Sequence, residues 1–118
     1  MTGRYINIFI FIFVLNIFMM EFNELNPGIL QKASDMLKAM AHPARIGIVS
    51  LLDDGKKRTV TEIHSKLGIG QAVASHHLVI LRDRGVLLSS REGKNIYYYL
   101  RHPNLGKMLN SLSDCCKD

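Results

Sequence analysis

The sequence has few of the residues that build crosslinks and catalytic centres. Among its 118 residues there are no tryptophans, three prolines and two cysteines. The cysteines are adjacent, Cys115 and Cys116, and a vicinal pair does not provide a framework of structural disulfides. We find no pairing of nucleophile and base, no glycine-rich phosphate loop and no cluster of metal ligands. These absences argue against an enzyme, a cofactor and a secreted disulfide-bonded domain, and they favour a cytoplasmic protein.

Residues 1–20 form an apolar N-terminal segment that differs from the rest of the chain. All five phenylalanines lie between Phe9 and Phe22, and no charged residue occurs between Tyr5 and Met20. The uninterrupted apolar run, 8–15, has eight residues, whereas a membrane-spanning helix needs about 20. No small-residue cleavage site follows it, so a signal peptide is not indicated.

Three interpretations of this segment stay open. Met19 and Met20 precede the first acidic stretch, and we favour a translation start at one of them, so that 1–20 is not part of the native protein. The alternatives, both less favoured, are a membrane anchor and an N-terminal helix that packs on a dimer. If the segment is made, its alternating β-branched and aromatic residues favour strand pairing. The working domain is expected at 21–118.

Charge is distributed unevenly along the chain. The net charge is +5, but residues 21–55 carry three basic and five acidic side chains, whereas 56–101 carry nine basic and three acidic ones. The positive charge therefore lies in the second half of the domain, which indicates an anionic partner for that half.

The stretch 61–81 predicts a helix–turn–helix. We expect a helix over 61–68 with Thr61 as its N-cap, a turn at 68–70 and a second helix over 71–84. The second helix has an apolar stripe at spacings of four and three residues, formed by Ala74, Leu78 and Leu81. Its exposed first turns carry uncharged hydrogen-bonding side chains: Gln71, Ser75 and His76. Such a tip is typical of a helix that enters a groove of DNA.

Further elements flank this unit, and the whole predicts an α+β, mostly α, winged helix–turn–helix. Two helices precede it, over 27–41 and over 43–53, and a break at His42-Pro43 separates them. The apolar stripe of the second is Ile46, Val49 and Leu52. A hairpin of 86–91 and 95–100 follows, with Gly93-Lys94 as its turn and with Ile96, Tyr98 and Leu100 facing the core. A C-terminal helix over 104–113 is apolar on one side and needs a partner surface.

We expect two kinds of DNA contact. Phosphates would be neutralised at the tip of the hairpin, which carries Arg91, Lys94 and Asn95, with Lys57 and Arg82 as further candidates. Base edges would be contacted by Gln71, Ser75 and His76, and a thymine methyl group by Val73. His77 lies one step nearer the core, so it either packs or contacts a phosphate. His64 is expected to be exposed rather than a metal ligand.

Two segments resemble the ArsR/SmtB family of winged-helix repressors: LKAMAHPARIGIVSLL at 37–52, and QAVASHHLVILRDRGVLLSSREGKNIYYYL at 71–100. The resemblance covers about residues 28–101, and His42 stands where the family commonly has an acidic residue. It implies a homodimer through the first and last helices, bound to a palindromic operator in double-stranded DNA and released by an inducer. The alternatives are a membrane-tethered winged-helix sensor and a winged-helix protein–protein module without DNA binding, which would have a neutral wing.

The family's sensing residues do not carry over to this sequence. The first helix of the helix–turn–helix, TEIHSKL, has no cysteine, and the last helix, NLGKMLNSLSD, offers only Asp114 as a ligand. No metal site is therefore predicted. Cys115 and Cys116 stay as candidates for redox or sulfur sensing, beside the simpler interpretation that they are ordinary residues of the C-terminal tail.

Overall fold

The computed structural model describes residues 8, 10–12 and 26–117, and it divides the chain into two units, 1–34 and 35–118. The predictions for 1–20, including the start site and the membrane anchor, therefore lie almost entirely outside the described residues. Residues 8 and 10–12 are helical and exposed. In the described part of the chain, no helix combines the length and the apolar character needed to cross a membrane.

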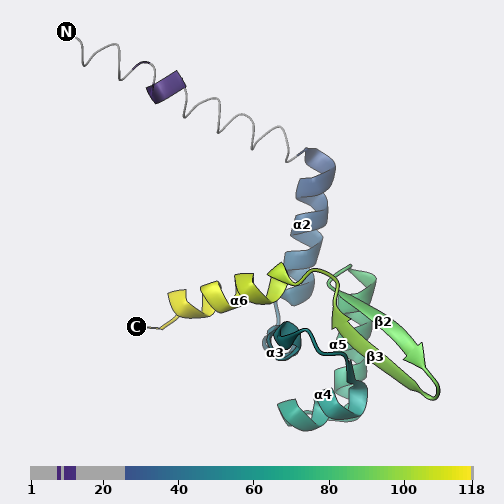
Figure 1. Ribbon diagram of the computed structural model, residues 1–118. Coiled ribbons are helices and arrows are strands. Elements are labelled where there is room, and N and C mark those ends of the chain that lie inside the picture. The colour runs from purple at the N-terminus through teal and green to yellow at the C-terminus, as the bar shows by residue number, and fades with distance from the viewer. Residues whose placement is uncertain (1–7, 9, 13–25, 118) are drawn as a thin grey trace. The chain divides into compact units, whose positions relative to one another are not determined.

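The described elements follow one another in the order of a winged helix–turn–helix (Figure 1). They are α2 (Pro27–Met40), α3 (Pro43–Leu51), the 3-10 turn η1 (Leu52–Asp54), β1 (Arg58–Thr59), α4 (Val60–Leu67), α5 (Gln71–Asp83), β2 (Leu87–Glu92), β3 (Asn95–Leu100) and α6 (Asn104–Cys115). The predicted fold class is thus confirmed. Helix α6 is two residues longer than predicted, and the other boundaries agree with the prediction or differ by at most two residues.

His42 lies between α2 and α3 and is the N-cap residue of α3. Its backbone is extended, with φ −155° and ψ 135°, as expected for a residue before proline. Its Nδ1 accepts a hydrogen bond of 3.1 Å from the backbone N–H of Ala44, and Pro43 occupies the first turn of α3. The imidazole therefore caps α3 in the way that a carboxylate does at many helix N-termini.

Helix α4 begins one residue before its predicted start, and its N-cap is Thr59 rather than Thr61. The Thr59 hydroxyl accepts from the Glu62 N–H at 3.2 Å and donates to the Glu62 carboxylate at 3.2 Å. The Thr59-x-x-Glu62 sequence is that of a capping box, but here the carboxylate bonds the cap hydroxyl rather than the Thr59 N–H. Thr59 takes the cap position because it pairs with Tyr97 in the sheet, so its extended backbone leads directly into the helix.

Three antiparallel strands form the small sheet, in the order β1-β3-β2. The β2–β3 register runs from Leu87 opposite Leu100 to Glu92 opposite Asn95, which leaves the predicted two-residue turn. Gly93 has φ +63°, a conformation that favours glycine at the first position of such a turn. Ile96, predicted to face the core, is 42% exposed because it lies one residue pair from the tip, beyond the residues that pair with β1.

The core of the second unit is built from one or more residues of every helix and of the hairpin. Its members are Ala39, Met40, Ile48, Val49, Leu52, Ile63, Leu78, Leu81, Val86, Leu87, Tyr98 and Leu109. The stripe of α5 is confirmed, since Ala74, Leu78 and Leu81 are fully buried. The stripe of α3 is partly wrong: Ile48 is buried in place of Ile46, which is 37% exposed.

Helix α6 lies against α3 and η1 (Figure 1), and its backbone at Gly106 comes close to a side chain of η1. Gly106 is buried directly against the Asp53 side chain, and the Asn110 amide donates to the Asp53 carboxylate at 2.8 Å. The absence of a side chain at Gly106 thus permits the contact that sets the position of α6.

Candidate nucleic-acid interface

The turn between α4 and α5 is closed by hydrogen bonds within the chain. Gly68 ends α4 with φ +66°, and the N–H of Ile69 donates to the carbonyl of His64 at 3.2 Å. The His64 Nδ1 lies 3.2 Å from the Ile69 carbonyl, so a proton on this nitrogen completes a second bond. His64 is half-buried and braces the turn, which corrects the prediction that it is exposed.

The first two turns of α5 present most of the predicted base-contacting side chains to solvent. Gln71, Val73 and His76 are exposed, and Ser75 is half-buried. His77 is only 7% exposed, because it points to the same side as the buried Leu78 and Leu81. The structure therefore places His77 in the packing alternative, and it brings the other four residues to one accessible tip.

The N-terminus of α5 has no side-chain cap. Gly70 occupies the N-cap position with an extended backbone, and no side-chain hydrogen bond satisfies the first N–H groups of this 13-residue helix. The positive end of the helix dipole is located there as well. Together with the exposed polar tip, this end of the helix is suited to an anion such as a phosphate.

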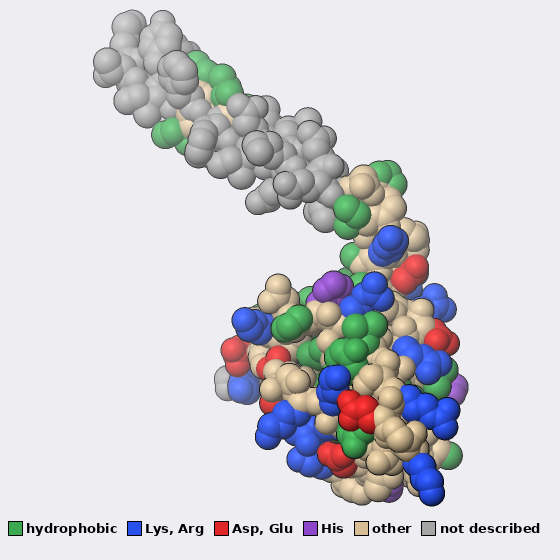
Figure 2. Space-filling view, turned by 45° about the vertical axis from the view of Figure 1, so that its right-hand side comes forward, with side chains coloured by type: hydrophobic (Ala, Val, Ile, Leu, Met, Phe, Trp, Pro, Cys, Tyr) green, Lys and Arg blue, Asp and Glu red, His purple; other side chains and the backbone are tan. Residues whose placement is uncertain are grey.

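The wing, β2–β3 with its turn, carries charge of both signs at its tip. Arg91, Lys94 and Asn95 are exposed as predicted. Glu92 is exposed between them, so the tip holds a carboxylate that the prediction did not consider. Figure 2, in which the side of the hairpin comes forward, shows Lys and Arg side chains distributed over this face of the second unit.

Two of the basic residues before α4 are engaged within the chain. Arg58 has a side chain only 11% exposed and lies 2.6 Å from the Asp54 carboxylate and 3.9 Å from that of Glu62. The pKa of Asp54 is lowered by the backbone N–H of Lys56 and further by Arg58. Lys57 places its ammonium group 4.8 Å from the centre of the Tyr99 ring, at the base of the wing. Lys57 therefore stays a candidate for a phosphate contact, whereas Arg58 is neutralised by its neighbours.

A cluster behind the tip joins α5 to α3 and to the end of α2. The Nε of Arg45 donates to His77 Nδ1 at 3.1 Å, and its Nη1 donates to the carbonyl of Ala39 at 3.1 Å. The His42 ring centre lies 4.7 Å from that of His77. Burial lowers the pKa of His77, and the neighbouring His42, Arg45 and His76 lower it further. No sequence pattern indicates this cluster, because Arg45 and His77 are 32 residues apart and each is unremarkable by itself.

An apolar groove lies between the end of α2, the start of α3 and α6. It has a volume of about 540 Å³ and is lined by Leu37, Met40, Ala41, Ile46, Met108, Leu109, Ser111, Leu112 and Cys115. Three of the lining side chains are strongly exposed: Leu37 at 55%, Met108 at 41% and Leu112 at 54%. The apolar side of α6 that was predicted to need a partner is thus located on this groove.

Cys115 and Cys116 are both exposed, and Cys115 borders the groove. Within 8, 10–12 and 26–117, no three His, Cys, Asp or Glu side chains come together in a way that could hold a metal ion. Sensing by the cysteines stays a prediction.

Comparisons with known proteins agree with this arrangement. Residues 42–88 match the family model described as bacterial regulatory protein, arsR family. The transcriptional repressor PagR of Bacillus anthracis is 36% identical over 84 residues, which cover 71% of this chain and 84% of that protein. The crystal structure of PagR has a TM-score of 0.64 and covers 70% of this chain and 94% of that one.

Two further solved structures are similar. The transcriptional repressor BigR from Xylella fastidiosa is 25% identical, with a TM-score of 0.69 over 85% of this chain and 97% of that one. A homodimeric winged helix–turn–helix DNA-binding domain from Mycobacterium bovis is 25% identical, with a TM-score of 0.66 over 75% of this chain and 82% of that one. Two of these relatives are thus named transcriptional repressors, and the third is described as a DNA-binding domain.

Proposed function

Because this chain belongs to the ArsR family of bacterial regulatory proteins, we propose that it is a transcriptional repressor that binds a palindromic operator as a homodimer. An inducer would release it from the operator. The single observation that carries the proposal is the combination, in one unit, of an exposed uncharged tip on α5 with an uncapped helix N-terminus and a basic wing. DNA needs both kinds of group, since phosphate contacts position the protein and base contacts specify the sequence.

The base contacts are assigned to the exposed tip. Gln71 can pair with adenine, His76 can donate to the acceptors of guanine, and Val73 can pack on a thymine methyl group. Ser75 is half-buried on the same side of the helix and would contact a base from closer to the core. His77 is left out of the contact set because its ring is buried.

The phosphate contacts are assigned to the wing and to the N-terminus of α5. Arg91, Lys94 and Asn95 lie at the wing tip, and Lys57 lies at its base. Each cation that neutralises a phosphate releases counterions, so binding should weaken steeply with salt.

The homodimer is assigned to the apolar groove. The exposed side chains of Leu37, Met108 and Leu112 belong to α2 and α6, the two helices that the family resemblance implies for dimerisation. The similar domain from Mycobacterium bovis is homodimeric. In such a dimer, the two copies of α5 should lie about 34–36 Å apart, which is one turn of DNA.

The sensing mechanism is the least constrained part of the proposal. Cys115 borders the groove, so oxidation or sulfur transfer there would act on the dimer surface. The thiols must be reduced before they can react, and the cytoplasm, in which we place the protein, keeps thiols reduced.

A gel-shift titration tests the DNA-binding part of the proposal. The probe is duplex DNA from the chain's own promoter region, and the salt concentration is varied between 50 and 200 mM. We expect specific binding that weakens by about 10³-fold or more over this range if six or more phosphates are contacted. The double variant Ser75→Ala/His76→Ala should lose about 10- to 100-fold in affinity for this DNA.

The matched control is Ser113→Ala/His102→Ala, which changes the same residue types at exposed positions of the C-terminal region. It should bind as the unmodified chain does. Salt-insensitive binding, or equal affinities for the two double variants, would contradict the assignment of the site.

A further inference from the structure

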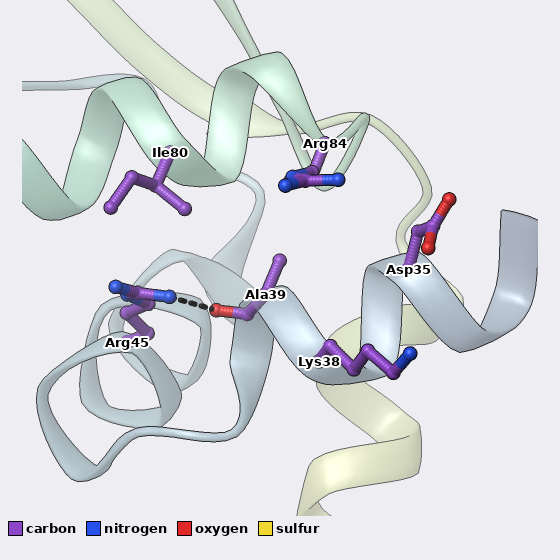
Figure 3. A pocket seen from close by; sticks show the side chains of 6 residues that line it. All are labelled: Asp35, Lys38, Ala39, Arg45, Ile80 and Arg84. Atoms are coloured by element: carbon purple, nitrogen blue, oxygen red, sulfur yellow. Dashed lines mark hydrogen bonds between the residues drawn. The ribbon is translucent and has the colours of Figure 1, made fainter.

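Arg45 joins three segments of the second unit that are distant in sequence. One nitrogen of its guanidinium donates to the Ala39 carbonyl near the end of α2, and Nε donates to His77 in the middle of α5. Figure 3 shows Arg45 reaching from α3 toward Ala39, with Ile80 of α5 and Arg84, the C-cap of α5, opposite. The space between them is a cleft of about 140 Å³, which is also lined by Asp35 and Lys38. We call the hydrogen bond from Arg45 Nε to His77 Nδ1 the clasp.

The clasp requires one particular protonation state of His77. Nδ1 must accept from Arg45, so it must carry a lone pair, and the ring proton must lie on Nε2. The other titratable groups that act on the ring are His42, at the start of α3, and His76, on the same helix. All of them are basic, and burial also disfavours the charged ring. Because burial and these neighbours lower its pKa from the ordinary 6.5, His77 is neutral at pH 7 and accepts the hydrogen bond.

We propose that Arg45 is a positioning residue that holds the DNA-contacting helix against α2 and α3 through the neutral ring of His77. Protonation of His77 breaks the clasp and weakens operator binding. The proposal rests on the proposed function, since His76, the neighbour of His77 in the chain, belongs to the exposed tip. It adds a regulatory input, proton concentration, to the DNA-binding unit.

The chemical step is a single proton transfer from solvent to His77 Nδ1. The lone pair that accepted from Arg45 then forms the new N–H bond, so two donors and two positive charges face each other where a hydrogen bond had been. The clasp is lost, while Arg45 keeps its second hydrogen bond, to Ala39. A change of this kind moves α5 relative to α2, and α2 is one of the helices assigned to the dimer.

The direction of the pH effect follows from the lowered pKa. The unfolded chain takes up a proton on this ring near pH 6.5, whereas the folded chain does so at a lower pH. The stabilisation by neutral His77 is therefore complete above pH 6.5 and is lost as the pH falls through the lowered value.

Nitrogen-15 NMR of the imidazole groups in the full chain tests the clasp without DNA. At pH 7.5 we expect His77 to be neutral, with the proton on Nε2 and an unprotonated Nδ1. The ring should take up a proton only below pH 6.5. A proton on Nδ1 at pH 7.5, or protonation of His77 at or above pH 6.5, would overturn the proposal.

Operator binding at constant ionic strength between pH 7.5 and pH 5.0 tests the consequence. The probe is the same promoter duplex. The unmodified chain should lose about tenfold in affinity toward pH 5 as the clasp opens. Arg45→Met should bind the duplex about tenfold more weakly at pH 7.5. Because it lacks the clasp, its affinity should not fall further when His77 takes up a proton.

His77→Asn is the matched variant, because its side-chain oxygen can accept near the position of Nδ1 but cannot take up a proton in this range. Its affinity for the duplex should lie within about threefold of that of the unmodified chain at pH 7.5, and this affinity should not change toward pH 5. The proposal would be overturned if His77→Asn lost as much DNA affinity toward pH 5 as the unmodified chain does. It would also be overturned if Arg45→Met bound DNA as tightly as the unmodified chain. If no chain binds the promoter duplex, the proposed function fails, and the NMR titration still decides whether the clasp exists.

Discussion

The proposed DNA-contacting face, formed by the helix–turn–helix and the wing, and the apolar groove differ in how complete each is within one chain. On this face, the turn is closed by His64 and the start of α4 is capped by Thr59. Its exposed residues are mostly polar or charged, with Val73 and Ile96 as apolar members. The groove instead leaves Leu37, Met108 and Leu112 substantially exposed around about 540 Å³ of apolar space. One chain therefore completes the proposed DNA-contacting face. It forms only part of the surface that would hold two copies of the chain together.

The two faces also rely on forces of different strength. Apolar burial contributes about 25 cal/mol per Å² and is insensitive to moderate salt. Exposed charges are screened over about 10 Å at 0.1 M salt, so single ones contribute little. Substitutions in the groove should consequently change the measured free energies of association most, and substitutions at the wing tip should change those of DNA binding least.

The largest effect is expected for Leu112→Glu in the groove. A carboxylate from each chain would enter the apolar interface, where an unpaired charge is costly. We expect the dimer to dissociate about 100-fold more readily, which corresponds to about 2.7 kcal/mol. Sedimentation equilibrium at micromolar concentrations measures this change.

The control for this change is Ser113→Glu, which adds the same charge at the next exposed position of α6, outside the groove lining. It should leave the dissociation constant unchanged. If Leu112→Glu stayed as dimeric as the control, the groove would not be the dimer interface, and the contrast between the two faces would disappear.

A smaller effect is expected for Gly106→Ala, which tests how α6 is held beside the groove. A Cβ at this position would lie 2.7 Å from the Asp53 Cβ and still closer to its carboxyl group, so the two segments must separate. We expect a loss of roughly 1–3 kcal/mol in the free energy of unfolding. Thermal and denaturant unfolding measure it.

Gly47→Ala serves as the comparison, because it also replaces a helical glycine. There the new Cβ would meet only Leu67 Cδ2 at 3.5 Å, an ordinary contact. This variant should gain up to about 1 kcal/mol from helix propensity. Equal effects of the two substitutions would show that α6 does not depend on the close approach at Gly106.

The smallest effect is expected at the wing tip. Lys94→Gln should weaken binding to all DNA sequences by a few-fold and reduce the slope of log K against log salt by about 1, since one phosphate contact is lost. Glu92→Gln, which removes a negative charge two residues away, should strengthen binding slightly. If either substitution changed the sequence preference, or if Lys94→Gln and Glu92→Gln both weakened DNA binding, the wing would contact bases rather than phosphates.

Most elements of this fold could be predicted from local signals in the chain. Pro43 and Gly93 mark a helix start and a hairpin turn, and the stripe of Ala74, Leu78 and Leu81 shows which side of α5 is buried. The predicted cap at Thr61 was wrong, because the choice between Thr59 and Thr61 depends on the pairing of Thr59 with Tyr97. Ile96 was also misplaced, since alternation along a strand does not tell where the core ends.

The sequence by itself determined the order of the elements, the buried side of α5 and the identity of the exposed tip, because these depend on helical and strand periodicity and on turn residues. The tertiary structure decided which polar residues stay available. It buried His77 against Arg45, paired Arg58 with Asp54 and left the groove between α2 and α6 open. The burial of His77 and the groove depend on contacts between residues far apart in the chain, where burial is set by neighbours that no local pattern shows. The Arg58–Asp54 pair joins residues only four apart, and the fold of the intervening segment decides whether they meet.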